Sequence, residues 1–469
     1  MAKLKELFGI DIRSLALFRV GLGLIILADL ISRSADLRAF YTDAGVLPRA
    51  ALLENPTYFW PVSLHMLSGS LTFQAFLFLL TGLAALALIF GYRTRVATFA
   101  CWLLVTSLHA RNQFINQAGD TLLHLYLFWA LFLPLAACCS VDRGPDPADS
   151  KIPKQVLSGG TVALLLQICF VYWFAAINKS GALWRDGTAL FYVFNLDTMV
   201  KPAGAFLLSY PGLVKFLANF TIWIESWGPF LAFVPVANGF FRTLAVFLFV
   251  AFHAGLIATM KLGSFPYISI LGWAVFLPSA FWDRLPKIGW WRRWGSWFSG
   301  FQRREINVGS QGLVHALALA LIAYVGLMNF ATTSIEKFRP VFMQKQRWLG
   351  KVLGIDQSWA MFAPDPLLED WRYSVPGRLR DGTEVELHGP DAIPNVKWRK
   401  YFNWMPKKNF AAFRSYYGNY LCREWNAGAP AGKELQSLRI YYLHETVLPN
   451  FRKSETRTEL LWEQDCSIK

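Results

Sequence analysis

The sequence predicts an all-α polytopic membrane bundle of about eight or nine transmembrane helices, followed by a C-terminal extracytoplasmic α+β domain. Of its 469 residues, 54% are hydrophobic and only 16% are charged, whereas a soluble domain has roughly a quarter charged residues. The mean hydropathy is +0.33. The apolar residues form blocks of about 18–22, long enough to cross a bilayer as helices. These observations exclude a soluble globular protein and a disordered chain.

Nine apolar segments are candidate spans. They are 13–33, 68–91, 96–110, 119–137, 157–177, 213–236, 241–260, 264–281 and 311–330. The first follows a short basic segment and has no small-residue cleavage site, so we expect it to be retained rather than removed as a signal peptide. A further apolar stretch, 188–200, is too short to cross and contains Asn195 and Asp197. We expect it to be re-entrant or interfacial, covered by protein or a cavity.

The positions of the basic residues predict the orientation. The net charge is +15, and Lys and Arg cluster in short loops between apolar segments. The predicted inner segments contain Lys3, Lys5, Arg13, Arg93, Arg95, Arg143, Lys151, Lys154, Arg284, Lys287, Arg292, Arg293, Arg303 and Arg304. This bias puts the N-terminus in the cytoplasm, and nine crossings then put the C-terminus outside. If 188–200 also crosses, the C-terminus lies inside. Nothing indicates nucleic-acid binding.

The chain divides at residue 335 into a transmembrane domain, 1–335, and a water-facing α+β domain, 336–469. Segments 371–387 and 438–447 alternate in polarity, as strands do, and Asp381-Gly382 is a tight-turn signal. Residues 409–425 have helical character.

The motif inventory excludes several chemistries. The six cysteines contain no C-x-x-C, and Cys422 and Cys466 are the only pair in the polar region, so a disulfide between them is possible. The sequence has no H-E-x-x-H, and its seven histidines are scattered, so no metal is expected. It also has no Walker A loop, G-x-G-x-x-G or G-x-S-x-G.

Ionisable side chains inside predicted spans are costly and usually face a cavity or a partner. They are Arg19, Asp29, Asp120, His124, Lys179, Glu225 and His253, with His109 and Arg111 at the end of the third span. In the predicted topology most of the acids, bases and cations lie in the outer halves of their spans, with Glu225 near mid-span. A polar cavity that opens toward the outer leaflet is therefore predicted.

Each of these residues also has a structural interpretation. Arg19 and Asp29 do not share a helix face, so each needs an interhelical partner and fits a structural role. His124 fits a hydrogen-bonded core histidine, and Glu225 fits either role. Lys179, at the turn before the re-entrant stretch, is a snorkelling lysine or a functional one. Burial disfavours its ammonium form and would make it a general base, provided that Asp120 and Glu225 do not pair with it closely.

Several short segments together carry a resemblance. They are 17–21, 40–48, Arg111-Asn112 with Gly119-Asp120, 171–187, 252–253 with 262–267, and 357–364. The chain resembles the horizontally transferred transmembrane (HTTM) family, bacterial relatives of the vitamin K-dependent γ-glutamyl carboxylase. Segment 171–187 is similar to the carboxylase segment with the catalytic lysine, which falls on Lys179, and segment 357–364 resembles the tryptophan motif that opens the outer domain.

The resemblance implies a quinol-dependent enzyme. Lys179, as a free amine, removes a proton from a reduced quinone (vitamin K hydroquinone or menaquinol). O2 adds to the quinolate, and the resulting alkoxide takes a γ-proton from a glutamyl residue. The carbanion captures CO2 and the quinone leaves as its epoxide. The expected site residues are Lys179, Asp120 and His253 for catalysis, Glu225, Asn112, Asn178 and Trp184 for the quinone pocket, and Arg19, Asp29 and Trp359 for structure.

Two positions depart from the carboxylase pattern. The carboxylase has a histidine where this chain has Asp120, and a second lysine where it has Asn178. An aspartate donates a proton only when protonated, so the carboxylation half-reaction is a separate question from the oxygenation.

The expected partners are membrane lipids, the quinone and a secreted peptide or protein substrate, in the plasma (inner) membrane of a bacterium. A second interpretation is a non-catalytic membrane protein that binds a lipid, a quinone or a secreted peptide for maturation or export. A transporter is a third, but the sequence shows no inverted repeat. An enzyme should lose its activity in Lys179→Ala, whereas a binding protein should tolerate this change.

Overall fold

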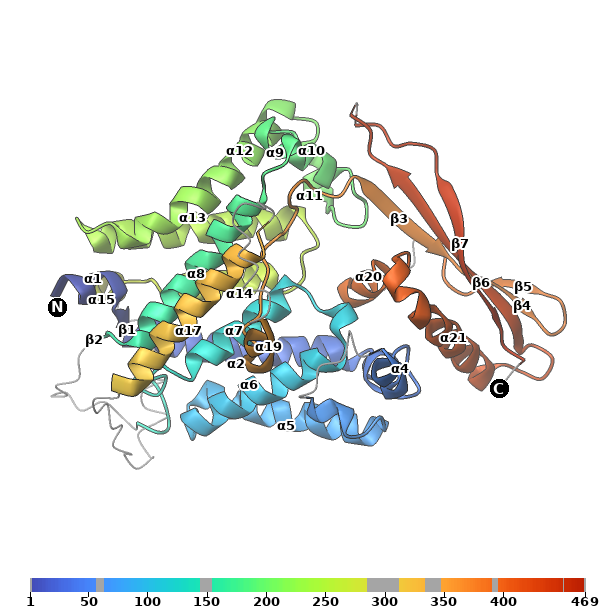
Figure 1. The fold of residues 1–469 in the computed structure, drawn as a ribbon, viewed down its shortest axis with the longest axis horizontal. Coiled ribbons are helices and arrows are strands. Elements are labelled where there is room, and N and C mark those ends of the chain that lie inside the picture. Colours follow the sequence, from blue (N-terminus) through green and yellow to red (C-terminus); the bar gives the residue numbers. More distant parts are fainter. Residues whose placement is uncertain are drawn as a thin grey trace.

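The computed structural model describes residues 2–55, 63–143, 154–284, 312–333, 347–389, 395–449 and 451–467. A bundle of long helices forms one part of the molecule, and a twisted sheet with its own helices forms the other (Figure 1). The predicted domain boundary after residue 335 lies outside the described residues, as do Lys151, Lys287, Arg292, Arg293, Arg303 and Arg304.

Five described helices are long and apolar enough to cross a membrane. They are α2 (Ile12–Ser34), α5 (Leu71–Phe90), α8 (Gly159–Asn178), α13 (Asn238–Thr259) and α17 (Gly312–Ala331). The other four predicted spans are also mainly helical, as α6 (Thr94–Arg111), α7 (Ala118–Ala130), α12 (Pro211–Trp227, continued by η4, Gly228–Phe233) and α14 (Phe265–Ala274). The bundle is therefore that of a membrane protein.

Two of the predicted spans, 119–137 and 264–281, are longer than the helices they contain. Helix α7 ends at Ala130 and α14 at Ala274, and each is followed by a turn. Pro134 and Pro278 lie a few residues beyond these ends. Proline has no N–H to donate and its ring clashes with the preceding turn, so neither helix can continue through it.

Short elements connect these helices. They are α1 (Ala2–Phe8), α3 (Leu37–Tyr41), α4 (Arg49–Glu54), η2 (Leu64–Met66), η3 (Gln113–Ile115), α9 (Ala182–Arg185), α10 (Ala189–Phe194), α11 (Pro202–Leu207), α15 (Ser279–Arg284), α19 (Arg347–Leu353) and the paired strands β1 (Ile10–Asp11) and β2 (Gln155–Val156).

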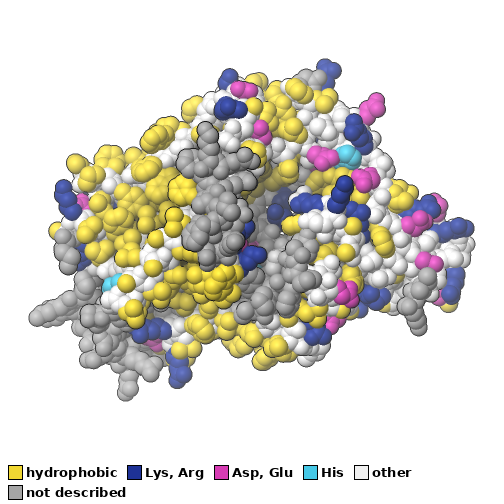
Figure 2. Space-filling model, in the orientation of Figure 1, with side chains coloured by type: hydrophobic (Ala, Val, Ile, Leu, Met, Phe, Trp, Pro, Cys, Tyr) yellow, Lys and Arg dark blue, Asp and Glu magenta, His cyan; other side chains and the backbone are white. Residues whose placement is uncertain are grey.

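Large apolar side chains are exposed along the outer faces of several helices. On α5 they include Phe76, Leu79 and Leu83, and on α12 and α13 Phe216, Trp223, Trp227, Phe240 and Phe247. Figure 2 shows hydrophobic side chains spread over the helical bundle, whereas charged side chains gather over the C-terminal sheet. An apolar surface of this extent is suited to lipid contact rather than to water.

The apolar stretch 188–200 is short and covered by protein, as expected for a re-entrant or interfacial segment. Its helix α10 has five buried residues, from Ala189 to Phe194. The C-terminal region covers its end, because the Asp370 carboxylate accepts hydrogen bonds from the Asp197 N–H (2.6 Å) and the Thr198 hydroxyl (2.9 Å). The backbone N–H groups of Asp197 and Thr198 thereby have an acceptor.

The C-terminal sheet is antiparallel and centred on β6 (Leu435–Thr446). Strands β3 (Glu369–Ser374) and β4 (Pro376–Leu379) pair with successive halves of one edge of β6, and β7 (Arg457–Asp465) pairs with the other edge. Strand β5 (Glu384–Glu386) extends from β4 through the turn at Asp381-Gly382. Gly382 adopts φ 85° there, a conformation that favours glycine.

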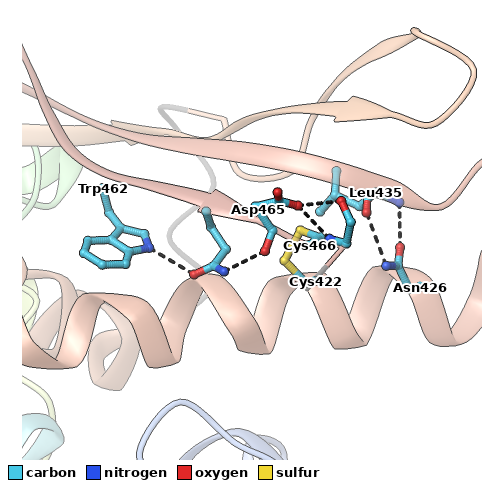
Figure 3. The surroundings of a disulfide bond; sticks show 8 residues. Cys422, Asn426, Leu435, Trp462, Asp465 and Cys466 are labelled. Carbon is cyan, nitrogen blue, oxygen red and sulfur yellow. Dashed lines mark hydrogen bonds between the residues drawn. A yellow bond between two sulfur atoms is a disulfide. The ribbon is translucent and has the colours of Figure 1, made fainter. Parts of the chain in front are cut away.

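Helices α20 (Val396–Phe402) and α21 (Arg414–Gly428), with η6 (Lys408–Phe413), complete this region. Cys422 on α21 and Cys466 just after β7 form a disulfide, with a Cα–Cα distance of 5.5 Å. One turn further along α21, the Asn426 amide exchanges two hydrogen bonds with the backbone of Leu435 (Figure 3). The helix is thus fixed to the start of β6 and to the end of β7.

Candidate functional site

A cavity of about 560 Å³ lies where the helical bundle meets the C-terminal region. Its walls come from α7, α8, α9, α10, α12, α13, the segment 260–265 that leads into α14, residues 358–367 and α20. Most of them are apolar, including Val171, Leu190, Met199, Leu256, Met260 and Leu262. A volume in this range suits a small organic ligand. Of the residues expected at the site, Lys179, Glu225, His253 and Trp184 line this cavity.

Lys179 and Glu225 form a buried ion pair. Lys179 is the C-cap of α8, and its Nζ lies 2.7 Å from Oε2 of Glu225 on α12. Only 3% and 7% of the two side chains are exposed. The Lys179 ammonium also lies 5.4 Å from the ring centroid of Trp184. The condition that Glu225 does not pair closely with Lys179 is therefore not met, whereas Asp120 does not pair with it.

The geometry of the pair suits proton exchange. One hydrogen bond of 2.7 Å joins Nζ of Lys179 to Oε2 of Glu225. An amine and a carboxyl group in this contact are able to pass a proton between them.

A second polar pair lies in the cavity wall. The Tyr172 hydroxyl on α8 lies 2.7 Å from Nε2 of His253 on α13, and both residues line the cavity. The Trp184 ring, which lies near the Lys179 ammonium, is held in place because its indole N–H donates a hydrogen bond to the Phe362 carbonyl at 2.7 Å. The polar groups of the cavity are thus held by the scaffold before any ligand binds.

Asp120 does not line the cavity. Its carboxylate accepts a hydrogen bond from the Arg33 guanidinium at 2.7 Å, and the same guanidinium bonds Asp29 at 2.6 Å. The Tyr41 hydroxyl lies 2.6 Å from another Arg33 nitrogen. Arg33 is fully buried. Asp120, the residue at which the chain departs from the carboxylase pattern, is therefore part of a buried charge network. Its neighbours Ala118 and Thr121 line the cavity.

Asp29, His109 and Asp120 place ligand atoms within 4.8 Å of one another, a spacing compatible with a metal ion. The Arg33 guanidinium already bonds both carboxylates. It supplies the positive charge that a cation would bring to these oxygens, so this donor set does not fit a metal while Arg33 is in place.

The remaining expected residues make structural contacts away from the cavity. Arg19 on α2 is fully buried and donates to the backbone carbonyls of Leu88 (3.4 Å) and Cys139, which are its interhelical partners. Gly91 fits against it, because a Cβ there would lie 1.7 Å from an Arg19 nitrogen.

The other polar residues of the bundle behave similarly. Asn112 donates to the Phe40 carbonyl at 3.1 Å, and Asn178 to the Phe174 carbonyl at 2.7 Å, so neither expected pocket residue lines the cavity. Trp359 is buried and donates to the Gln357 side chain. His124 has no hydrogen-bond partner for its Nδ1 among the described residues, so the expected bonding of this core histidine is not seen there.

Several residues of the site were not singled out from the sequence. Arg33 lies four positions after Asp29, a spacing that places both on one helix face and is visible in the sequence. Tyr172, Asp365, Arg399 and Lys400 also line the cavity. The last three come from the C-terminal region, and no local sequence signal places them beside a transmembrane lysine.

Fold and site together define a polytopic helical membrane protein with a buried lysine–glutamate pair in an apolar cavity. Residues 9–282 match the family model described as the HTTM domain, and the chain belongs to this family, as its motifs indicated. HTTM domains occur in vitamin K-dependent carboxylase-like membrane proteins. No curated protein and no solved structure matches this chain.

Proposed function

We propose that this chain is a membrane enzyme of the vitamin K-dependent γ-carboxylase type, in which Lys179 deprotonates a reduced quinone. The observation that carries the proposal is the pairing of Lys179 with Glu225 at the wall of an apolar cavity. The quinol (vitamin K hydroquinone or menaquinol) and O2 would together supply the strong base. In the full reaction, CO2 would supply the carboxyl group that is added to a glutamyl substrate.

The residues of the cavity fit such a ligand. A quinol has an apolar ring system with two hydroxyl groups, and the cavity has apolar walls with a small number of polar groups, of which Lys179 and the Tyr172–His253 pair are the main ones. This combination of apolar surface and few oriented polar groups is typical of small-molecule sites. No metal ion is needed for proton removal by an amine.

Glu225 would control the protonation of Lys179. When its carboxylate accepts the ammonium proton over their hydrogen bond, the lysine amine has a lone pair and can take a proton from a hydroxyl group. The same carboxylate then stabilises the ammonium that forms again. Tyr172 and His253 would orient the ligand by hydrogen bonding, and Trp184, stacked near the ammonium, would keep water from it.

The proposed setting is a bacterial plasma membrane, with eight or nine crossings, the N-terminus in the cytoplasm and the C-terminal region outside. The Cys422–Cys466 disulfide supports this orientation, since disulfides persist in oxidising compartments. A secreted peptide or protein would then reach the cavity from the side of the C-terminal region.

The test is quinone epoxide formation by the purified protein in lipid nanodiscs, with vitamin K hydroquinone or menaquinol and O2, read by mass spectrometry. The wild type should form epoxide and Lys179→Ala should not, while both proteins remain folded by size-exclusion chromatography. If folded wild type forms no epoxide with either quinol, the alternative applies: a non-catalytic membrane protein whose apolar cavity binds a lipid, a quinone or a secreted peptide.

A further inference from the structure

Lys400 contributes to the cavity a cation that no carboxylate of the described residues contacts. It lies on α20 in the C-terminal region and lines the cavity together with Lys179. In the part of the chain that the structure describes, no acceptor lies within hydrogen-bond distance of its ammonium and no carboxylate within 4.0 Å. Burial lowers the pKa of Lys400, and the charges of Lys407 and Arg399 lower it further, while Asp120 opposes them. A negative charge added beside Lys400 would therefore stabilise its ammonium.

The rest of the cavity is already balanced. Lys179 is paired with Glu225, and the Asp365 carboxylate accepts a hydrogen bond from the Leu183 N–H at 2.9 Å. Arg399 donates to the backbone carbonyls of Thr198 and Lys261, so its hydrogen bonds are used. Among the described lining residues, three Lys and Arg side chains therefore face two carboxylates, which leaves one positive charge.

The backbone around Lys400 is firmly held. Its helix begins at Asn395, whose side chain accepts hydrogen bonds from the N–H groups of Lys397 and Trp398. The Lys397 ammonium donates to Ser32 on α2 at 2.7 Å, and the Trp398 indole donates to Asp36 at 2.9 Å. One turn of helix thus anchors the C-terminal region on the bundle and presents Lys400 to the cavity from a rigid support.

We propose that Lys400 binds the carboxylate of the substrate side chain and is the residue that selects an acidic side chain over its amide. This inference rests on the proposed function for the nature of the substrate, and it assigns to Lys400 a specificity role beside the base, Lys179. A single carboxylate matches the single unbalanced charge. An amide brings no charge and would leave the Lys400 ammonium unpaired in a poorly solvated site.

The position of Lys400 favours a peptide over a lipid as the source of the carboxylate. Lys400 belongs to the region whose surface is rich in charged side chains, whereas the lipid-suited surface lies on α5, α12 and α13 (Figure 2). A peptide approaching from the water-facing side would meet Lys400 at the wall formed by α20, and the apolar flanks of its acidic residue would contact side chains such as Met361 and Leu367.

The test is equilibrium binding to the full chain in nanodiscs of zwitterionic lipid, without quinol, so that it does not depend on turnover. The probes are a fluorescent, end-blocked pentapeptide with one central glutamate between leucines and the same peptide with glutamine, measured by fluorescence anisotropy. Wild type should bind the glutamate peptide at least about tenfold more tightly. Lys400→Gln should bind both peptides equally, and Lys400→Arg should keep the preference.

Lys407→Gln is the matched control, since this neighbouring lysine stacks 4.0 Å from the Trp404 ring centroid and does not line the cavity. It should keep the preference. Equal binding of both peptides by wild type, or an unchanged preference in Lys400→Gln, overturns the proposal, as does Lys400-dependent binding of oleate without a peptide preference. A clear preference without epoxide formation would instead contradict the proposed oxygenation while leaving the carboxylate site standing.

Discussion

The ammonium of Lys179 lies 2.7 Å from the carboxylate of Glu225, and the two side chains come from different helices, α8 and α12. A buried pair of this kind costs much of its Coulomb energy in lost hydration, so it is weak evidence for stability alone. Its position at the wall of the cavity is the one that the proposed proton transfer requires. The first prediction separates the two roles.

Replacing Glu225 with glutamine should lower epoxide formation by at least about 100-fold, because the ammonium that forms when Lys179 takes the quinol proton is then left without a carboxylate in a buried site. The measurements are the initial rate of epoxide formation and the thermal midpoint in nanodiscs. Glu463→Gln, an acid exposed on the sheet, should behave as wild type in both. A purely structural Glu225 would lower the thermal midpoint and leave the rate of the folded protein unchanged.

The second prediction concerns Arg33, which bonds both Asp29 and Asp120 in the core of the bundle. Arg33→Met leaves two buried carboxylates without their partner, and the loss of one partner of a buried ion pair costs about 3–5 kcal/mol. The thermal midpoint in nanodiscs should fall markedly. Arg439→Met is the matched control, because Arg439 pairs with Glu463 at an exposed position, and it should change the midpoint little. Similar shifts for both variants would contradict a core role for Arg33.

The sequence predicts the helical bundle well because burial in lipid demands long apolar segments, and these are visible without tertiary information. It also predicts that Lys179, Glu225 and His253 share a cavity, since costly ionisable groups gather where a cavity can take them. The prediction for Asp120 differs from the structure for a definite reason. Its partner, Arg33, stands at the end of a span, where an arginine is usually read as interfacial.

Lys400 and Arg399 illustrate what the sequence cannot provide. They lie more than 170 positions after Glu225, in a short helix that the sequence places in the water-facing region. The docking of α20 on the bundle brings them to the cavity, through Lys397 to Ser32, Trp398 to Asp36, and Arg399 to Thr198 and Lys261. Contacts between distant segments depend on tertiary packing, which leaves no periodic signal in either segment.

The third prediction is a pH dependence of the C-terminal sheet. A hydrogen bond from Thr456, with Arg372 and Lys453 nearby, lowers the pKa of Glu445. A carboxyl group with a depressed folded pKa contributes stability above its unfolded pKa of about 4.3. That contribution is lost as the pH falls through the folded value. Glu445→Gln should therefore lower the thermal midpoint by about 2 °C at pH 6, and by less at pH 3.5. An equal difference at both pH values would refute this role.

The fourth prediction concerns the disulfide between Cys422 and Cys466, which closes 44 residues of sequence between α21 and the end of β7. Replacing both cysteines with alanine should destabilise the C-terminal region by about 2–4 kcal/mol, because the cross-link restricts the unfolded chain. Limited proteolysis of the nanodisc-embedded protein should then cleave this region faster. The Cys101→Ala variant, which removes a free buried thiol of the bundle, should leave this cleavage rate unchanged.

The same cysteines report the side of the membrane on which the region lies. Cells alkylated before lysis should yield protein in which Cys422 and Cys466 react with a maleimide reagent only after reduction, because an outer location keeps the disulfide oxidised. Protein in which both cysteines were alkylated before lysis, and which takes up no maleimide after reduction, would place the region in the reducing cytoplasm. That result would contradict the proposed orientation, in which the C-terminal region lies outside.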